Sequence, residues 1–144
     1  MAVNLYFEDV EIGQEVPPIV RQTDFMHWNR YAAVNDEFVY VHMDDAVGAA
    51  AGQGAAFGMG NLRWAYVINA LQDWIGDECE VRDLSMQFRA INHKHDTLTT
   101  QGVVTDKQVE DGEHRVYLDI NVVNQDGVQG APGKAIVVLP SREG

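Results

Sequence analysis

The segment from residue 57 to residue 75 constrains the fold most, because it is apolar around most of a helical circumference. Its apolar residues include Leu62, Trp64, Ala65, Val67, Ile68, Leu71, Trp74 and Ile75. A helix with apolar residues on nearly every side is enclosed by the rest of its protein, whereas a surface helix keeps one polar face. The sequence therefore predicts a long helix that other elements surround.

The pattern changes to alternation after Gly76, and alternation of apolar and polar residues is typical of strands. Two turn dipeptides, Asp111-Gly112 and Asp126-Gly127, divide this half of the chain, and the second and third strands are expected to form a hairpin. The expected strands cover residues 79–90, 97–107, 114–124 and 134–139. Such strands predict an antiparallel sheet that curves around the long helix, which is an α+β fold.

The amino-terminal half predicts smaller elements after an irregular arm. Residues 19–22 form a first strand, and Thr23 or Asp24 caps a helix that runs to about residue 34. Asp44 or Asp45 caps a short alanine-rich helix, which the glycines of residues 52–54 end. No repeat or long linker interrupts the 144 residues, so we expect residues 1–144 to form a single domain.

Composition excludes several classes of function. The formal net charge of −12 argues against nucleic-acid binding, which needs a basic surface. One cysteine, Cys79, excludes a disulfide within the chain, and no apolar run is long enough for a signal peptide or a membrane span. We therefore expect a cytoplasmic protein. The cluster His93-Lys94-His95-Asp96 offers too few ligands for zinc and includes a repelling lysine, so no metal is expected.

The loop of residues 35–43 carries the residues most indicative of chemistry. Asp36 and Glu37 precede His42 by six and five residues, between two predicted helices. A carboxylate and an imidazole on one loop can act as an acid/base pair that moves water and a proton across a carbon–carbon double bond. The loop is therefore a candidate catalytic site.

The run Y-A-A-V-N-D-E-F-V-Y-V-H-M-D from residue 31 to residue 44 resembles the MaoC-like dehydratases, also called R-specific enoyl-CoA hydratases. Their signature is roughly Y-A-x-x-S-G-D-x-N-P-I-H-x-D. Tyr31, Ala32, His42 and Asp44 match it, and Glu37 falls where the family has its catalytic aspartate. The arm Y-F-E-D-V-E-I-G-Q-E and residues 88–98, similar to the family's first sheet hairpin, extend the resemblance over nearly the whole chain.

This resemblance implies a hotdog fold, in which the sheet wraps the long helix, and a site for acyl thioesters. His42 and Glu37 would hold one water that is added to a 2-enoyl thioester or removed from a 3-hydroxyacyl thioester. An alignment with one extra loop residue puts Asp36 in the catalytic place instead. The Gly58 amide would stabilise the enolate-like charge. The chain departs from the signature at Val39-Tyr40, where the family has Asn-Pro, and at Phe57, where the family has histidine.

The resemblance also implies a substrate site and no resident cofactor, because the coenzyme A thioester is itself the substrate. A coenzyme A phosphate needs a basic patch, which in this acidic chain falls to a few residues beyond the long helix, including Arg82, His93 and His95. Arg63 is expected on the solvated face of the long helix. The candidate substrate-binding residues are Asn61, Phe57, Tyr40, Arg89 and Lys94.

Two other functions remain open at this point. A hotdog thioesterase usually places an acid on or near the long helix, but residues 62–70 contain none and Asp73 comes late. A non-catalytic subunit would pair with a catalytic relative, and the lost Asn-Pro and His-Gly features favour it. Hotdog domains of this kind pair edge to edge, so we expect a homodimer or a larger homo-oligomer, or a heterodimer with a related subunit.

Overall fold

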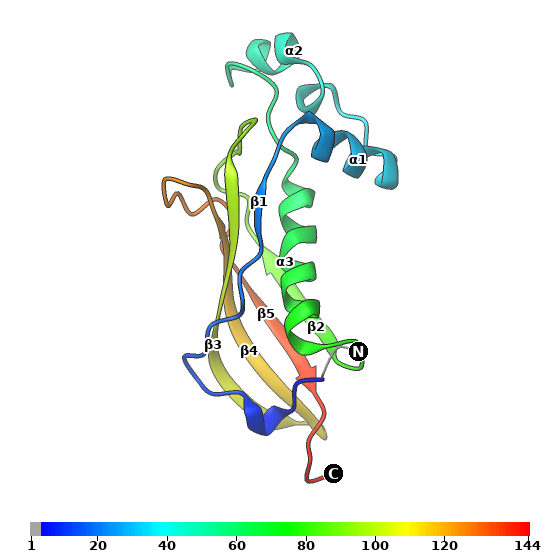
Figure 1. The fold of residues 1–144 in the computed structure, drawn as a ribbon, viewed down its shortest axis with the longest axis vertical. Helices are drawn as coiled ribbons and strands as arrows, with labels where there is room; N and C mark the ends of the chain where they lie inside the picture. Colours follow the sequence, from blue (N-terminus) through cyan, green and yellow to red (C-terminus); the bar gives the residue numbers. More distant parts are fainter. Residues whose placement is uncertain (1–3) are drawn as a thin grey trace.

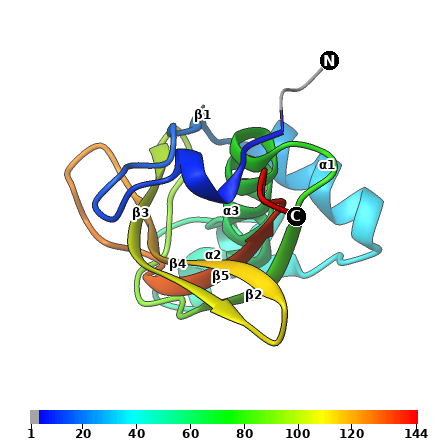
Figure 2. The ribbon, with the colours of Figure 1, turned by 90° about the horizontal axis from the view of Figure 1, so that it is seen from below.

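A five-stranded antiparallel sheet curves around one long helix in the computed structural model, which describes residues 4–144. Figures 1 and 2 show the helix α3 (Gly60–Ile75) lying along the sheet, which curls around it. The predicted α+β layout, with a long central helix wrapped by a curved sheet, is confirmed. In spatial order the strands are β1 (Val20–Gln22), β3 (Thr97–Glu110), β4 (Glu113–Val123), β5 (Gly133–Leu139) and β2 (Glu80–Met86).

The core lies between α3 and the inner face of the sheet. On α3, Val67, Leu71 and Ile75 are buried to 2% exposure or less, and they belong to one apolar cluster with Val116 and Leu118 of β4. Each such side chain stabilises the fold by about 1.5–3 kcal/mol relative to an exposed one. The other apolar residues of the helix, Trp64, Ala65, Ile68 and Trp74, are only partly buried, so α3 is not enclosed on every side as the sequence predicts.

Two shorter helices extend beyond one end of the sheet (Figure 1). They are α1 (Phe25–Asn35) and α2 (Asp45–Ala50), and a 3-10 turn, η2 (Tyr40–His42), lies between them. Asp24 and Asp44 are the N-caps, each accepting hydrogen bonds from two backbone amides of the first turn. Both caps were among the alternatives predicted from sequence.

The predicted start of the long helix is wrong by three residues. The helix begins at Gly60, whereas Phe57 forms an isolated β-bridge with His93 and the Gly58 amide donates to the carbonyl oxygen of Asn92, 2.8 Å away. A Cβ atom placed on Gly58 would lie only 2.1 Å from Asn92 Nδ2. This close crossing of two chain segments requires glycine and delays the helix.

Two strand boundaries also differ from expectation. β2 stops at Met86 instead of residue 90, and β3 continues to Glu110 in a long hairpin with β4. Because β2 and β3 lie at opposite sides of the sheet, residues 87–96 cross between them and do not form the turn of a hairpin, as residues 88–98 were expected to do. This crossing brings Asn92 and His93 against the start of α3.

The amino-terminal arm is held along β3 before β1 begins. Backbone hydrogen bonds join Gly13 and Gln14 to Val104, and Val16 to Gly102.

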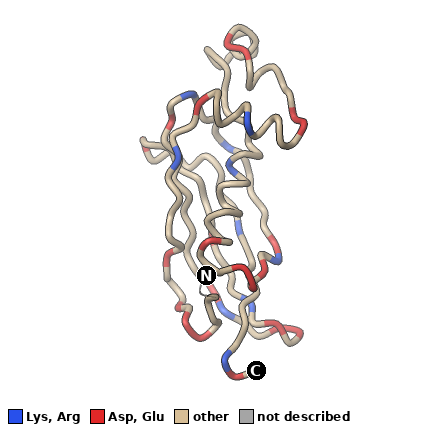
Figure 3. Tube along the Cα trace, turned by 45° about the vertical axis from the view of Figure 1, so that its right-hand side comes forward, with Lys and Arg blue, Asp and Glu red and all other residues tan. Residues whose placement is uncertain are grey.

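Figure 3 shows acidic residues at both ends of the elongated molecule. Among residues 4–144 no helix has the length and apolar character needed to cross a membrane.

Candidate functional site

His42 is held by the main chain next to the start of α3. Its Nδ1 lies 2.7 Å from the carbonyl oxygen of Phe57, and the two rings meet edge to face at 5.1 Å. A carbonyl oxygen only accepts hydrogen bonds, so Nδ1 carries the proton. In the neutral imidazole Nε2 therefore keeps its lone pair, and this half-buried ring can take up a proton at that atom.

The two acidic candidates of the loop have different surroundings. Asp36 ends α1 in the left-handed conformation, with φ of 51°, and its side chain is exposed. Glu37 is partly buried, and its Oε2 lies 3.4 Å from Asn61 Nδ2 on the first turn of α3. Only Glu37 of the two is thus linked to the start of α3.

Tyr31 provides a second indication of where the Glu37 carboxylate lies. Burial raises the pKa of the Tyr31 hydroxyl above its ordinary value, and the negative charge of Glu37 raises this pKa further. The end of α1, the loop and the first turn of α3 therefore place Tyr31, Glu37 and Asn61 in one neighbourhood.

The expected role of the Gly58 amide is not supported by its hydrogen bonding. Its N–H donates to the carbonyl oxygen of Asn92 and therefore already has an acceptor in this structure. The following amides of Met59, Gly60 and Asn61 have no hydrogen-bond acceptor among residues 4–144. They are the unpaired N–H groups of the helix start, where negative charge is favoured.

Several apolar side chains of the loop are exposed. Tyr40 is 73% exposed and Phe38 is 55% exposed, whereas Phe57 is partly buried against His42. Val34 and Val39 add to this surface at the end of the molecule formed by α1 and η2. Phe57 thus contacts His42, whereas Tyr40 shares the turn η2 with His42 and contributes to an open apolar surface.

The two basic candidates for substrate binding differ in whether they are paired with a carboxylate. Lys94 pairs with Asp45 of α2 at 2.6 Å and lies over the Phe25 ring, and the hydrogen bond to Lys94 lowers the pKa of Asp45. Arg89 is exposed and donates to Gln87, with no carboxylate within ion-pair distance among residues 4–144. Arg89 is therefore the freer cation.

Arg63 contradicts the expectation that it lies on the solvated face of the long helix. It is 4% exposed and donates through Nη1 to the carbonyl oxygens of Ala90 and Gly130. Burial lowers the pKa of its guanidinium group. Helical periodicity gave no signal of this burial, because the covering residues come from the crossing segment and from the chain before β5.

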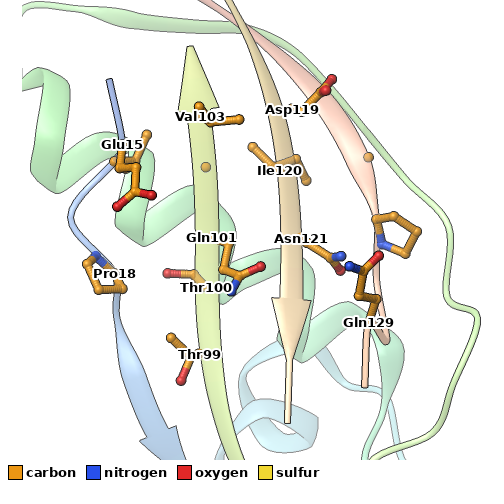
Figure 4. A pocket seen from close by; sticks show the side chains of 14 residues that line it. Glu15, Pro18, Thr99, Thr100, Gln101, Val103, Asp119, Ile120, Asn121 and Gln129 are labelled. Atoms are coloured by element: carbon orange, nitrogen blue, oxygen red, sulfur yellow. The ribbon is translucent and has the colours of Figure 1, made fainter. Parts of the chain in front are cut away.

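A separate cavity of about 550 Å³ lies over β3 and β4, away from the loop. Figure 4 shows side chains such as Gln101 of β3, Asn121 of β4 and Gln129 around it, and none of the predicted site residues lines it. Among residues 4–144 no three metal-binding side chains gather into a cluster. The candidate site is therefore the surface formed by the loop and the start of α3.

Solved structures of hydratases share this overall fold. The R-hydratase PhaJ1 from Pseudomonas aeruginosa, in its unliganded form, matches with a TM-score of 0.87 and 23% identity, covering 96% of this chain and 88% of that chain. The (R)-hydratase from A. caviae involved in PHA biosynthesis matches with a TM-score of 0.83 and 21% identity, covering 92% and 99%.

A chain of a two-component complex is also similar. The ChsH1–ChsH2 complex from Mycobacterium tuberculosis matches with a TM-score of 0.78 and 20% identity, covering 90% of this chain and 98% of that chain. No family model matches the sequence, and no curated protein is similar enough in sequence to match. At these identities the likeness establishes a shared hotdog fold.

Proposed function

We propose that this chain is a hydratase or dehydratase that interconverts 2-enoyl and 3-hydroxyacyl thioesters. The observation that carries the proposal is the hydrogen bond from His42 Nδ1 to the carbonyl oxygen of Phe57, which leaves Nε2 as a base on the loop that holds Glu37. The fold shared with two R-hydratases supports this choice of reaction.

In the proposed hydration, His42 and Glu37 bind one water molecule between them. One of the two groups takes a proton from the water, the hydroxide oxygen bonds to C3, and the other group supplies a proton to C2. Dehydration runs the same steps in reverse, so both groups serve as acid and base in turn. Asn61 orients the Glu37 carboxylate, which supports Glu37 over Asp36 as the acidic partner.

The developing charge on the thioester oxygen needs donors in this scheme. We assign this role to the unpaired amides at the start of α3 from Met59 to Asn61, in place of the Gly58 amide. Arg89, without a carboxylate partner, is the proposed contact for a phosphate of coenzyme A or of a carrier-protein arm.

We also propose that a second hotdog subunit covers the exposed apolar side chains of the loop. Phe38, Val39 and Tyr40 are each between 44% and 73% exposed, although they adjoin His42 in sequence. A partner over this surface would exclude water from the acyl group and complete the site. The same reasoning allows a homodimer or a pair with a related subunit.

The proposal is tested by adding purified protein to crotonyl-CoA and to longer enoyl-CoA thioesters and following the absorbance of the conjugated double bond. We expect this absorbance to fall as water adds, and the Glu37→Gln variant to lose the activity. Asp36→Asn is the matched control, because Asp36 is exposed and is not bonded to α3. Faster release of free thiol than of hydroxyacyl product would indicate a thioesterase instead.

A non-catalytic subunit is the second candidate function. The observations that favour it are the exposed apolar surface and the fold shared with a component of the ChsH1–ChsH2 complex. In that case the chain alone would hydrate no enoyl thioester of any length. Activity of a reconstituted pair would then be the same with wild-type chain and with its His42→Ala variant.

A further inference from the structure

Arg63 is a buried cation that has no acidic partner. Among residues 4–144 no carboxylate lies within ion-pair distance of its guanidinium group, which donates to Ala90 O at 2.5 Å and Gly130 O at 3.2 Å. The Phe88 ring lies 5.1 Å from its central carbon. A buried charge is costly unless its donors are satisfied, yet Arg63 Nε has no acceptor in the described chain.

A second buried atom without a partner belongs to Asn92, a residue that lines the same small space as Arg63. Asn92 Oδ1 is buried without a donor, while its Nδ2 donates to Thr23 Oγ1 at 3.4 Å. Arg63 and Asn92 both line a void of about 10 Å³ that is otherwise mainly apolar, with Leu98 and Val122 in its wall. One water needs roughly 10–15 Å³, so this space suits a single water.

Asn92 connects this void to the candidate site. Its carbonyl oxygen accepts from the Gly58 amide, and its carboxamide lies directly against the Gly58 Cα. The carbonyl oxygen of the preceding residue, Phe57, is the atom that accepts from His42 Nδ1. The Phe57 carbonyl and the Gly58 amide belong to one peptide unit, so Asn92 contacts the same unit that accepts from His42.

We propose that Arg63 and Asn92 are positioning residues joined by one buried water. The water accepts from Arg63 Nε–H and donates to Asn92 Oδ1, which satisfies both atoms. Through Asn92 and Gly58 it fixes the Phe57 carbonyl and hence the orientation of the His42 ring. Of the tests below, only the measurement of a catalytic rate depends on the proposed function.

The first test is a high-resolution crystal structure of the wild-type chain. We expect one ordered water within hydrogen-bond distance of both Arg63 Nε and Asn92 Oδ1. The second test follows the His42 Nδ1–H signal by nuclear magnetic resonance of protein labelled with nitrogen-15 histidine. The signal is assigned by its loss in His42→Ala, and we expect it to shift in both Asn92→Leu and Arg63→Met.

Val137→Ala is the matched control, because Val137 is a fully buried β5 residue whose truncation weakens the core. It should lower the melting temperature without moving the His42 signal. Arg63→Lys keeps the charge and lacks Nε–H, and it replaces Arg63→Met if that variant does not fold. A well-ordered void without water, or a His42 signal that stays in place in the variants at both positions, overturns the inference.

Catalysis provides a third readout. We expect kcat of Asn92→Leu to fall on the order of ten- to a hundredfold with little change in KM, because a displacement near 1 Å in a catalytic group has such an effect. An inactive wild-type chain would contradict the proposed hydratase, whereas the water and the His42 signal decide the positioning inference separately.

Discussion

His42 donates a hydrogen bond from Nδ1 to the main-chain carbonyl oxygen of Phe57, 2.7 Å away. The interaction joins the loop before α2 to the segment that leads into α3, and it fixes which ring nitrogen carries the proton. Because a backbone carbonyl is the acceptor, a side-chain substitution at residue 57 leaves this acceptor in place. Only a substitution of His42 itself can therefore separate the proposed role of Nε2 as a base from the hydrogen bond that Nδ1 makes to Phe57.

His42→Asn separates these two roles, because its amide nitrogen can replace Nδ1 as donor while nothing replaces Nε2. We expect its stability to stay near wild type and its hydration rate to fall about 10²–10⁴-fold, the usual contribution of a general acid or base. His42→Ala should lose the rate and also about 0.5–1.5 kcal/mol of stability with the hydrogen bond. Steady-state kinetics and urea unfolding measure both effects, and an active His42→Asn would contradict the proposed role of Nε2.

Asp36→Gly tests the assignment of the acidic partner. Asp36 has φ of 51°, a conformation that glycine adopts without strain, so we expect stability to be unchanged or to rise by up to about 1 kcal/mol. The hydration rate should stay within about twofold of wild type, because surface changes that touch no functional group are nearly neutral. Loss of activity with stability intact would instead identify Asp36 as the catalytic acid.

Tyr31 reports on the charge of Glu37. Burial and the Glu37 carboxylate both raise the pKa of Tyr31, so Glu37→Gln should lower this pKa and bring Tyr31 ionisation to lower pH. Ultraviolet difference titration against a Tyr31→Phe variant isolates this one tyrosine among five. Asp36→Asn serves as the charge-matched control and should shift the titration less than Glu37→Gln does.

Cys79 should react slowly with alkylating reagents in the folded protein. Burial raises the pKa of its thiol, and Sγ donates to the carbonyl oxygen of Ile75 at 3.0 Å. A raised pKa lowers the thiolate fraction at neutral pH, and thiolate is the reactive form. Mass spectrometry after iodoacetamide treatment should show slower modification in buffer than in urea. Equal rates in both would mean that the carboxyl end of α3 is open in solution.

Tyr40 tests the proposed cover of the loop. A Tyr40→Asp substitution places charge on an exposed apolar surface, so we expect it to weaken or abolish subunit association while the monomer stays folded. Sedimentation analysis and circular dichroism measure the two properties. Val109→Asp is the control, since Val109 is 62% exposed but lies near the distal end of β3. Equal association in both variants would place the subunit contact elsewhere.

Helix caps and strands could be predicted from the sequence because their signals are local. Asp24 and Asp44 bond to amides within three residues, and the alternation of β3 and β4 is read directly from neighbouring positions. The start of α3 could not be predicted in this way. The Gly58 amide donates to the carbonyl oxygen of Asn92, thirty-four positions later in the chain. Only the folded chain brings these two residues together.

The candidate site was predictable to the extent that it lies within one loop. His42 and Glu37 are close in sequence, but the atoms that orient them belong to Phe57 and Asn61, which follow a separate helix. Arg63 was misplaced because helical periodicity describes the neighbours along a helix and cannot describe the segment that crosses over it. Contacts between distant segments account for these differences.

The pairing of the amino-terminal arm with β3 has a consequence for how the chain acquires its shape. The Ile19 amide donates to Thr100 Oγ1 across a separation of 81 residues, so this contact closes a very long loop. Contacts of such separation form late, because their entropic cost must be met before they stabilise anything. During synthesis, α1 and the His42 loop would leave the ribosome long before β3 exists to support them. Premature termination ahead of β3 would therefore yield chains that contain every candidate catalytic residue and still assemble no site.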